Sequence, residues 1–243
     1  MKAVILAAGI ASRLRPLTNH TPKCLLEIGG KSLLERAIQG LLTNNIREIV
    51  LVTGYLQEQI VSFVQKKFPE VDVKFIYNKK YATTNNIYSL WLVKNSIQGE
   101  DIVLLDSDIL FDPGLVTAVI NSPYPDTLAL NSHPLCEEEM KVIADPMGKV
   151  VEISKTCSPE QAIGESIGIE KISHTYLQYL FAELDHMILK EDLGNVFYEA
   201  AFQRLIAQGK SFHIVDTSTL FSMELDTLED FQTATEKLPA NLL

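Results

Sequence analysis

Along the first half of the chain, short apolar runs alternate with stretches in which apolar residues recur every three or four positions. The short runs are rich in β-branched residues, which is typical of buried strands, and the longer stretches have the period of amphipathic helices. Strands are predicted at Ala3–Leu6, Glu48–Thr53, Val71–Tyr77 and Ile102–Leu105, and helices at Ser32–Leu42, Leu56–Val64 and Asn86–Ile97. Ser32 and Glu35 have the spacing of a capping box. This order predicts a parallel sheet with helices on both faces.

The second half has shorter elements, separated by Pro and Gly. Strands are predicted at Leu128–Leu130, Lys141–Ile143, Val150–Ile153, Ile167–Ile169 and Phe212–Val215, and helices at Thr175–Leu189, Val196–Gln208 and Leu228–Leu238. The sequence contains no linker, internal repeat or low-complexity tract. We therefore expect one α/β domain over 1–243, in which the part from about 121 to 243 elaborates the part from about 1 to 120.

Charge and cysteine content narrow the class of protein. The 243 residues include 21 Lys and Arg against 31 Asp and Glu, a formal net charge of −10. This balance argues against nucleic acid or an anionic membrane surface as the main partner. Cys24, Cys136 and Cys157 are too widely spaced for a disulfide framework or a C-x-x-C zinc site. Without a long apolar run or a signal-peptide pattern, the sequence predicts a cytoplasmic protein.

A loop of small residues follows the first predicted strand. Leu6-Ala7-Ala8-Gly9 should turn at Gly9, where small side chains let a ligand approach free backbone N–H groups. Arg13 and Lys23 add two positive charges, so the segment is a candidate triphosphate cradle. The alternative is an ordinary strand–helix turn with two solvated cations. The spacing matches neither a P-loop nor a dinucleotide-binding fingerprint.

The longer string L-A-A-G-x-x-S-R-L, followed by Pro22-Lys23, resembles the signature of the nucleoside triphosphate transferase family. This family includes sugar-1-phosphate nucleotidylyltransferases and bacterial cytidylyltransferases. The resemblance implies a Rossmann-like mixed, mainly parallel sheet flanked by helices, with a nucleotide-binding half followed by an acceptor-binding half. It also implies that Arg13 and Lys23 act catalytically on the triphosphate, and that nucleotide contacts come from Leu6, Ala7, Ala8 and Gly9.

Acidic residues stand at the end of the fourth predicted strand, in Asp106-Ser107-Asp108. Ligand sites in open α/β sheets lie at such strand ends, and carboxylates beside phosphates commonly bind Mg²⁺. A turn with a capping role is the alternative. The resemblance selects Asp108 as one metal ligand and Asp226, before the last helix, as the second, with Mg²⁺ as the cofactor. Asp226 could also serve as the N-cap of that helix.

The segment Tyr81–Leu90 separates branches of this family. It resembles the Y-x-x-x-N-N-x-Y-S-L segment of bacterial phosphocholine and 2-aminoethylphosphonate cytidylyltransferases, whereas sugar-specific members usually carry Gly-Thr-Ala. The resemblance assigns Tyr81, Thr84 and Asn85 to nucleotide binding, and Asn86 and Tyr88 to acceptor binding. On sequence alone, an uncharged loop entering a helix is the alternative.

Two later segments complete the acceptor site by the same resemblance. Lys155 takes the place of the lysine that holds the acceptor phosphate, and Glu165 belongs to the same pocket. In Asn195–Glu199, the residues Tyr198 and Glu199 close the pocket. Carboxylates beside aromatic rings suit an ammonium group. The alternatives are a surface role for Lys155 and a core role for Tyr198.

These features together predict a Mg²⁺-dependent cytidylyltransferase. Its partners would be a nucleoside triphosphate, with CTP favoured, and a small phosphate or phosphonate acceptor such as choline phosphate or 2-aminoethylphosphonate. A sugar-1-phosphate or polyol-phosphate nucleotidylyltransferase is the first alternative. A nucleotide sensor without turnover is the second, and it has no need of both metal carboxylates. Whether the chain forms a homodimer stays open.

Overall fold

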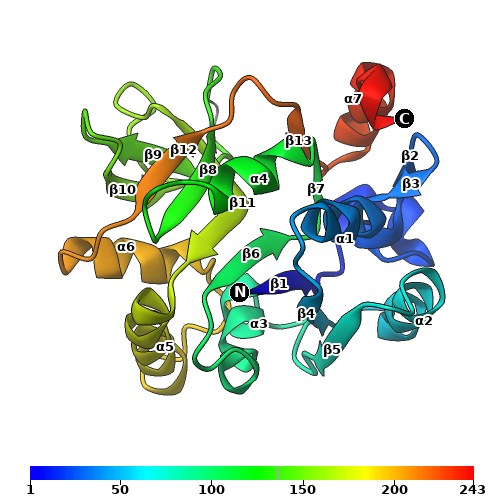
Figure 1. Ribbon diagram of the computed structural model, residues 1–243, viewed down its shortest axis with the longest axis horizontal. Coiled ribbons are helices and arrows are strands. Elements are labelled where there is room, and N and C mark those ends of the chain that lie inside the picture. The colour runs from blue at the N-terminus through cyan, green and yellow to red at the C-terminus, as the bar shows by residue number, and fades with distance from the viewer. Residues whose placement is uncertain (136) are drawn as a thin grey trace.

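The computed structural model describes residues 1–135 and 137–243, and the described part contains a nine-stranded mixed sheet (Figure 1). The parallel part has the order β6-β1-β4-β5. Its strands are β1 (Lys2–Ala7), β4 (Glu48–Thr53), β5 (Asp72–Tyr77) and β6 (Ile102–Asp106). The remaining strands are β8 (Thr127–Asn131), β9 (Lys141–Ala144), β10 (Val150–Ser154), β11 (Gly164–Ile172) and β12 (His213–Asp216). Since β11 pairs antiparallel to β6, the predicted mixed, mainly parallel architecture is confirmed.

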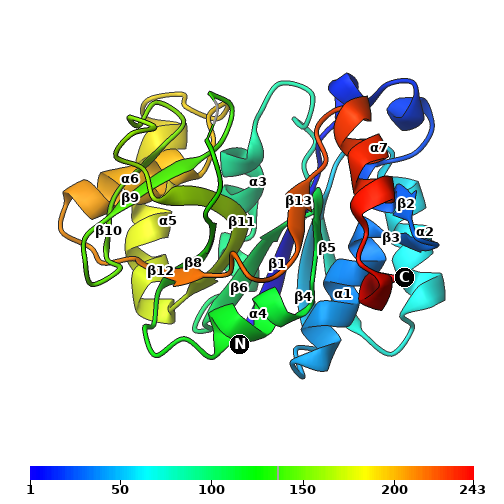
Figure 2. The same ribbon diagram turned by 90° about the horizontal axis from the view of Figure 1, so that it is seen from above.

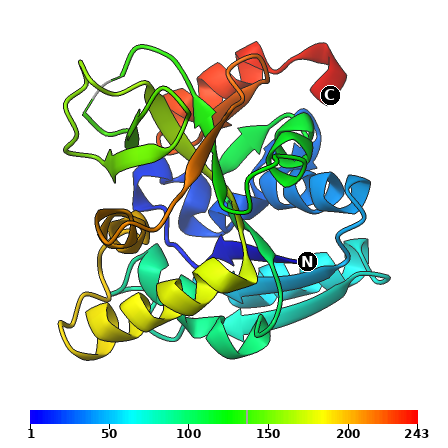
Figure 3. The same ribbon diagram turned by 60° about the vertical axis from the view of Figure 1, so that its left-hand side comes forward.

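Helices cover both faces of the sheet because β1 is apolar on both sides. Ala3 and Ile5 join a core with α1 (Leu33–Thr43), α2 (Gln57–Lys67) and α4 (Gly114–Ile120). Val4 and Leu6 join a second core with α3 (Asn86–Leu92), α5 (His174–Leu189) and α6 (Glu199–Ala207), and Figure 2 shows α5 and α6 on the side of the sheet away from α1 and α2. Figure 3 brings α5 in front of the sheet. Each fully buried large apolar side chain stabilises the fold by roughly 1.5–3 kcal/mol.

The last part of the chain returns to the N-terminal half. After β12, the strand β13 (Ser222–Glu224) pairs antiparallel with β7 (Ile109–Phe111), which directly follows β6. The closing helix α7 (Leu228–Lys237) then packs near the hairpin of β2 (Glu27–Ile28) and β3 (Lys31–Ser32). This return places residues 224–226 beside the carboxyl end of β6.

Three local expectations are corrected. The helix expected over 86–97 ends at Leu92, where the chain tightens into a 3-10 turn at Lys94–Ser96. Ser32 caps α1, but the carboxylate of Glu35 binds Gln39 and Lys67 instead of completing a capping box.

The third correction concerns the last helix. Its N-cap is Thr227, in a capping box with Asp230, and not Asp226. The carboxylate of Asp226 is therefore available to the cavity described below. Among the described residues, no helix is long and apolar enough to cross a membrane.

Candidate active site

A cavity of about 470 Å³ opens where β1 and β6 end, at the carboxyl edge of the parallel strands. Cavities of this size hold nucleotide-sized ligands. Most of the residues singled out from sequence line it: Leu6, Ala7, Ala8, Gly9, Arg13, Lys23, Tyr81, Thr84, Asn85, Asn86, Asp108, Lys155, Glu199 and Asp226. The fold thus brings together segments that span almost the whole chain.

The loop after β1 presents open backbone to the cavity. Within the described part of the chain, no hydrogen bond uses the N–H of Gly9, Ile10 or Ala11. A Cβ added to Gly9 would meet nothing within 4 Å, so a ligand has room to approach. The left-handed residue of the turn is Ala11, with φ 50° and ψ 52°, and not Gly9 as expected. Successive N–H groups of this kind form an anion-binding concavity.

Lys23 projects from the 3-10 turn Lys23–Leu25 into an acidic environment. Its Nζ lies 2.8 Å from Oδ2 of Asp108 and 2.7 Å from Oδ1 of Asp226. Burial opposes its charge, but these two carboxylates raise the pKa of Lys23 well above its usual value. The guanidinium of Arg13 contacts Asp226 and lies 3.0 Å from Oε2 of Glu138. Both predicted triphosphate-binding cations are therefore paired with carboxylates here.

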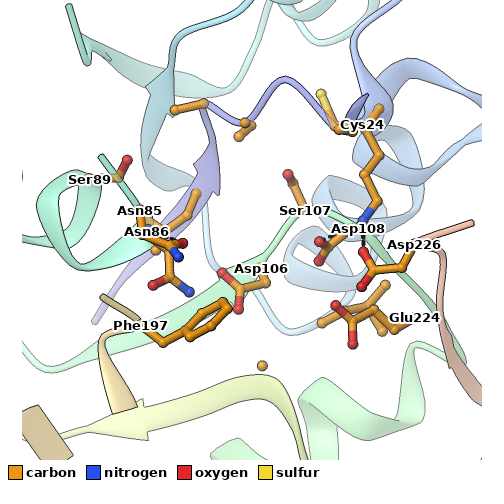
Figure 4. Close-up of a pocket in the computed structure, with 18 of the residues that line it drawn as sticks. Cys24, Asn85, Asn86, Ser89, Asp106, Ser107, Asp108, Phe197, Glu224 and Asp226 are labelled. Carbon is orange, nitrogen blue, oxygen red and sulfur yellow. Dashed lines mark hydrogen bonds and ion pairs between the residues drawn. The ribbon is translucent and has the colours of Figure 1, made fainter. Parts of the chain in front are cut away.

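Three carboxylates gather beside Lys23, and one of them was not singled out from sequence. Oxygen atoms of Asp108, Glu224 and Asp226 lie within 4.8 Å of one another, as the right-hand side of Figure 4 shows. Partial burial and the charges of Asp108 and Asp226 raise the pKa of Glu224 to about 8. Burial also acts to raise the pKa of Asp226, but the positive charges of Lys23 and Arg13 outweigh it, so the pKa of Asp226 is lowered overall. The signal that could have found Glu224 is its position two residues before Asp226, in the same acidic segment.

This group of carboxylates is suited to a divalent cation. Hard oxygen ligands are what Mg²⁺ prefers, and it commonly combines one or two carboxylates with phosphate oxygens. A cation among Asp108, Glu224 and Asp226 would relieve the repulsion that raises the pKa of Glu224. The residues present therefore fit a magnesium ion.

The lining of the cavity also includes Lys155, Phe197 and Glu199. The Nζ of Lys155 lies 4.6 Å from the centre of the Phe197 ring. Glu199, at the start of α6, is only 5% exposed, and its Oε2 has no hydrogen-bond partner among the described residues. A buried carboxylate oxygen without a donor is costly, and burial accordingly raises the pKa of Glu199. Phe197 lies in the Asn195–Glu199 segment already noted but was not itself predicted.

Tyr198, predicted to bind the acceptor, does not line the cavity. Its side chain is fully buried and packs edge-on against Phe202. Its hydroxyl lies 3.1 Å from Oδ2 of Asp106 and 3.3 Å from both carboxylate oxygens of Glu170. Burial, then the surrounding carboxylates, raises the pKa of Asp106 well above its usual value. Asp106 lines the cavity, and the buried hydroxyl of Tyr198 donates a hydrogen bond to its carboxylate.

Two further predicted acceptor residues, Glu165 and Tyr88, also lie outside the lining of the cavity. Glu165 lies outside the lining because its Oε1 pairs with Nε2 of His133 at 2.8 Å. Tyr88 is also absent from the lining, since its ring packs against Trp91 with centroids 5.3 Å apart. The helix periodicity of α3 explains this: Asn86 and Ser89, three residues apart, share the face that lines the cavity, so Tyr88 points in a different direction.

The asparagines at the start of α3 have structural partners as well as cavity positions. Asn85 is the N-cap of α3, and Oδ1 of Asn86 accepts the N–H of Tyr198 at 2.9 Å. Behind them, Nδ2 of Asn78 donates to Thr84 and Ser89. Figure 4 shows Asn85, Asn86 and Ser89 across the cavity from Asp108 and Asp226, with Asp106 between the two groups. Neither Asn78 nor Ser89 was predicted as a site residue, although Ser89 belongs to the Tyr81–Leu90 segment.

Comparison with known proteins identifies the family of this chain. Residues 2–123, about half of the chain, match the family described as Nucleotidyl transferase. The chain belongs to the nucleotidyl transferase family. The resemblance based on the N-terminal signature is thereby confirmed, and so is the expectation of a nucleotidyltransferase.

Relatives in this family include cytidylyltransferases. A choline-phosphate cytidylyltransferase of Streptococcus pneumoniae is 41% identical over 107 residues, 44% of this chain and 45% of that protein. The chain thus matches less than half the length of this relative. A CTP:phosphoglutamine cytidylyltransferase of Campylobacter jejuni is 27% identical over 98% of this chain and 100% of its own length. The solved structure of CTP:phosphocholine cytidylyltransferase from Streptococcus pneumoniae superimposes with a TM-score of 0.80 and 26% identity, covering 98% and 99% of the two chains.

Glu199→Gln is expected to change how stability depends on pH. Burial raises the pKa of Glu199 to about 7 from a usual value of 4.5, so between these values the folded protein keeps a proton that the unfolded chain has lost. The free energy of unfolding that this group contributes therefore falls as pH rises through that window. From pH 4.5 to 7.5 the wild type should lose up to roughly 3 kcal/mol more than the variant in urea unfolding. Parallel pH profiles of the two proteins would contradict this.

Proposed function

We propose that this nucleotidyltransferase is a Mg²⁺-dependent cytidylyltransferase that transfers CMP from CTP to a small acceptor carrying an amine and a phosphate or phosphonate. The observation that carries the proposal is the arrangement of one cavity. Lys23 lies between Asp108 and Asp226, and the open loop 9–11, Lys155 and Glu199 line the same cavity.

The proposed reaction is an in-line displacement. An oxygen of the acceptor phosphate attacks the α-phosphorus of CTP, forming a new P–O bond. The bond from the α-phosphorus to the oxygen bridging to the β-phosphate breaks, and pyrophosphate leaves with that electron pair. Because the attacking oxygen is already anionic, no strong general base is needed. The barrier lies in bringing two anions together, which favours positioning and charge neutralisation.

Lys23 and Arg13 supply charge on the nucleotide side. Each now pairs with carboxylates, so triphosphate oxygens would replace part of these contacts. The N–H groups of Gly9–Ala11 would bind phosphate oxygens at the same time. A magnesium ion held by Asp108, Glu224 and Asp226 would neutralise phosphate charge there.

Lys155 and Glu199 define the acceptor side. The ammonium of Lys155 would bind the acceptor phosphate, and the carboxyl group of Glu199, in the same cavity lining, would bind the acceptor ammonium. One aromatic ring, Phe197, lines this region, whereas a quaternary ammonium usually takes several rings. A primary ammonium, with N–H donors for Glu199, fits better. Glu165, the other predicted carboxylate, lies outside the lining of the cavity. Glu199 is therefore the carboxylate that we propose for binding the acceptor ammonium.

A sugar or polyol phosphate is the second candidate acceptor. The free Nδ2 side of Asn86, whose Oδ1 is already occupied, could serve hydroxyl groups in the same cavity. A sensor without turnover is disfavoured, because a binding module has no use for three clustered carboxylates beside a buried lysine.

A pyrophosphate-release screen tests the proposal. CTP, UTP, GTP and dTTP are each combined with 2-aminoethylphosphonate, choline phosphate, glycerol phosphate and a hexose-1-phosphate, with and without Mg²⁺. CTP with an amine-bearing acceptor is expected to exceed every hexose combination in kcat/KM by at least about tenfold. A hexose-1-phosphate with UTP or GTP as the best pair would replace the substrate assignment. Tight CTP binding without pyrophosphate release for any pair would favour the sensor.

A further inference from the structure

A buried lysine in the acceptor half takes no part in the mechanism above. Lys141, the first residue of β9, is 1% exposed. It lies opposite Ser154 of β10 and Glu165 of β11, so the strand that carries it is flanked on both sides. Burying an ammonium is costly unless its donors are satisfied, and the position of Lys141 therefore calls for an explanation.

The donors of Lys141 reach two segments at the edge of the cavity. Its Nζ lies 2.9 Å from the main-chain oxygen of Lys155 and 3.1 Å from that of Glu137. Lys155 lines the cavity, and so does Glu138, the residue after Glu137, which pairs with Arg13. One ammonium thus links the turn that carries Lys155 to the segment that approaches Arg13.

A second buried lysine offers a comparison within the same sheet. Lys171 of β11 is 7% exposed, and its Nζ lies 3.2 Å from the main-chain oxygen of Ile120 and 2.7 Å from that of Ser122. These carbonyls follow or end α4 and do not belong to the cavity. Like Lys141, Lys171 donates hydrogen bonds to two main-chain carbonyl oxygens, but the segment that carries these carbonyls lies outside the cavity.

We propose that Lys141 is a positioning residue for the acceptor site: by binding the carbonyl oxygens of Lys155 and Glu137, it holds Lys155 where the acceptor phosphate binds. This inference rests on the proposed role of Lys155. Replacing Lys141 should therefore displace the backbone at Lys155. The affinity for the acceptor should fall, although every side chain that contacts the acceptor is unchanged.

The first test needs no substrate. Hydrogen–deuterium exchange of the amides at 154–157 is compared in wild type, Lys141→Met and the matched control Lys171→Met. Exchange in this segment should rise about fivefold or more in Lys141→Met and stay at the wild-type rate in Lys171→Met. Equal exchange in all three proteins would overturn the proposal. If Lys141→Met does not fold, Lys141→Arg, which keeps the charge but alters the donor geometry, is measured instead.

The second test is a double-mutant cycle in pyrophosphate release, with CTP and either choline phosphate or 2-aminoethylphosphonate. Lys141→Met should raise the KM for the acceptor about tenfold and the KM for CTP less than about twofold. In a Lys155→Ala background the same substitution should change the acceptor KM less than about twofold, because the residue it positions is gone. An equal rise in both KM values, or the same effect in Lys171→Met, would show a general structural role and overturn the proposal.

The two tests separate failure of the inference from failure of the proposed function. Lys155→Ala with an unchanged acceptor KM would remove Lys155 from phosphate binding, and the acceptor assignment would fall with it. The exchange result would still decide whether Lys141 orders the Lys155 segment. Absence of turnover with both acceptors would likewise contradict the proposed substrates and leave the exchange result to decide the positioning role.

Discussion

Asp226→Asn is expected to lower kcat for pyrophosphate release by about 100-fold or more, which corresponds to about 3 kcal/mol of transition-state stabilisation. The carboxylate of Asp226 contacts Lys23 and Arg13 and lies in the group with Asp108 and Glu224. Asparagine keeps the shape but removes the charge that both a magnesium ion and the two cations need. Asp108→Asn should have an effect of the same order, since its Oδ2 is the other partner of Lys23.

The measurement is a magnesium titration of steady-state turnover. The Mg²⁺ concentration for half-maximal activity should rise in Asp226→Asn, because one ligand has lost its charge. Asp185→Asn is the matched control: this aspartate also pairs with a lysine, Lys94, at 2.6 Å, but it lies outside the cavity. It should keep wild-type turnover and magnesium dependence. Near-normal turnover in Asp226→Asn would remove this residue from the metal site.

Lys23→Met is the second change with a large expected effect. We expect kcat to fall by about 100- to 1000-fold, because the lost charge faces the phosphoryl group on which negative charge builds during transfer. The KM for CTP should rise as well, since the same ammonium is proposed to bind the triphosphate. Removing Lys23 also leaves Asp108 without its lysine partner and Asp226 with Arg13 as its remaining cation, so the free energy of unfolding should fall.

Kinetics and urea unfolding must be measured together to separate these effects. Lys94→Met removes a lysine from an ion pair of similar length and controls for a general loss of stability. It should leave both kcat and the KM for CTP unchanged. The assignment of Lys23 would be wrong if Lys23→Met folded normally and changed only the KM for the acceptor.

Much of the fold follows from local pattern. The strands β1, β4 and β6 are short runs of Val, Ile and Leu, and buried parallel strands have this composition because both faces are covered. Helix boundaries were less well predicted. Asn86–Ile97 has one continuous apolar pattern, but the helix ends at Leu92, since tertiary packing and not periodicity fixes where the chain tightens.

The nucleotide side of the cavity could be predicted because its residues lie close together in sequence or carry a family signature. Gly9, Arg13 and Lys23 all fall within the first 23 residues, and all line the cavity. The acceptor side was predicted only in part. Lys155 and Glu199 line the cavity, but Tyr198 is buried and Glu165 is paired with His133, because side-chain direction within a segment depends on what packs behind it.

The sequence by itself determined the family, the α/β class and the chemical types at the site: cations in a small-residue loop and aspartates at a strand end. Only the tertiary structure decided which of these groups meet. Asp108 and Asp226 come together because β13 pairs with β7, which follows directly from the end of β6. That pairing also adds Glu224 to the carboxylate group and frees Asp226 from helix capping. Such contacts depend on strand pairing between residues more than 100 positions apart in the chain, so no local pattern specifies them.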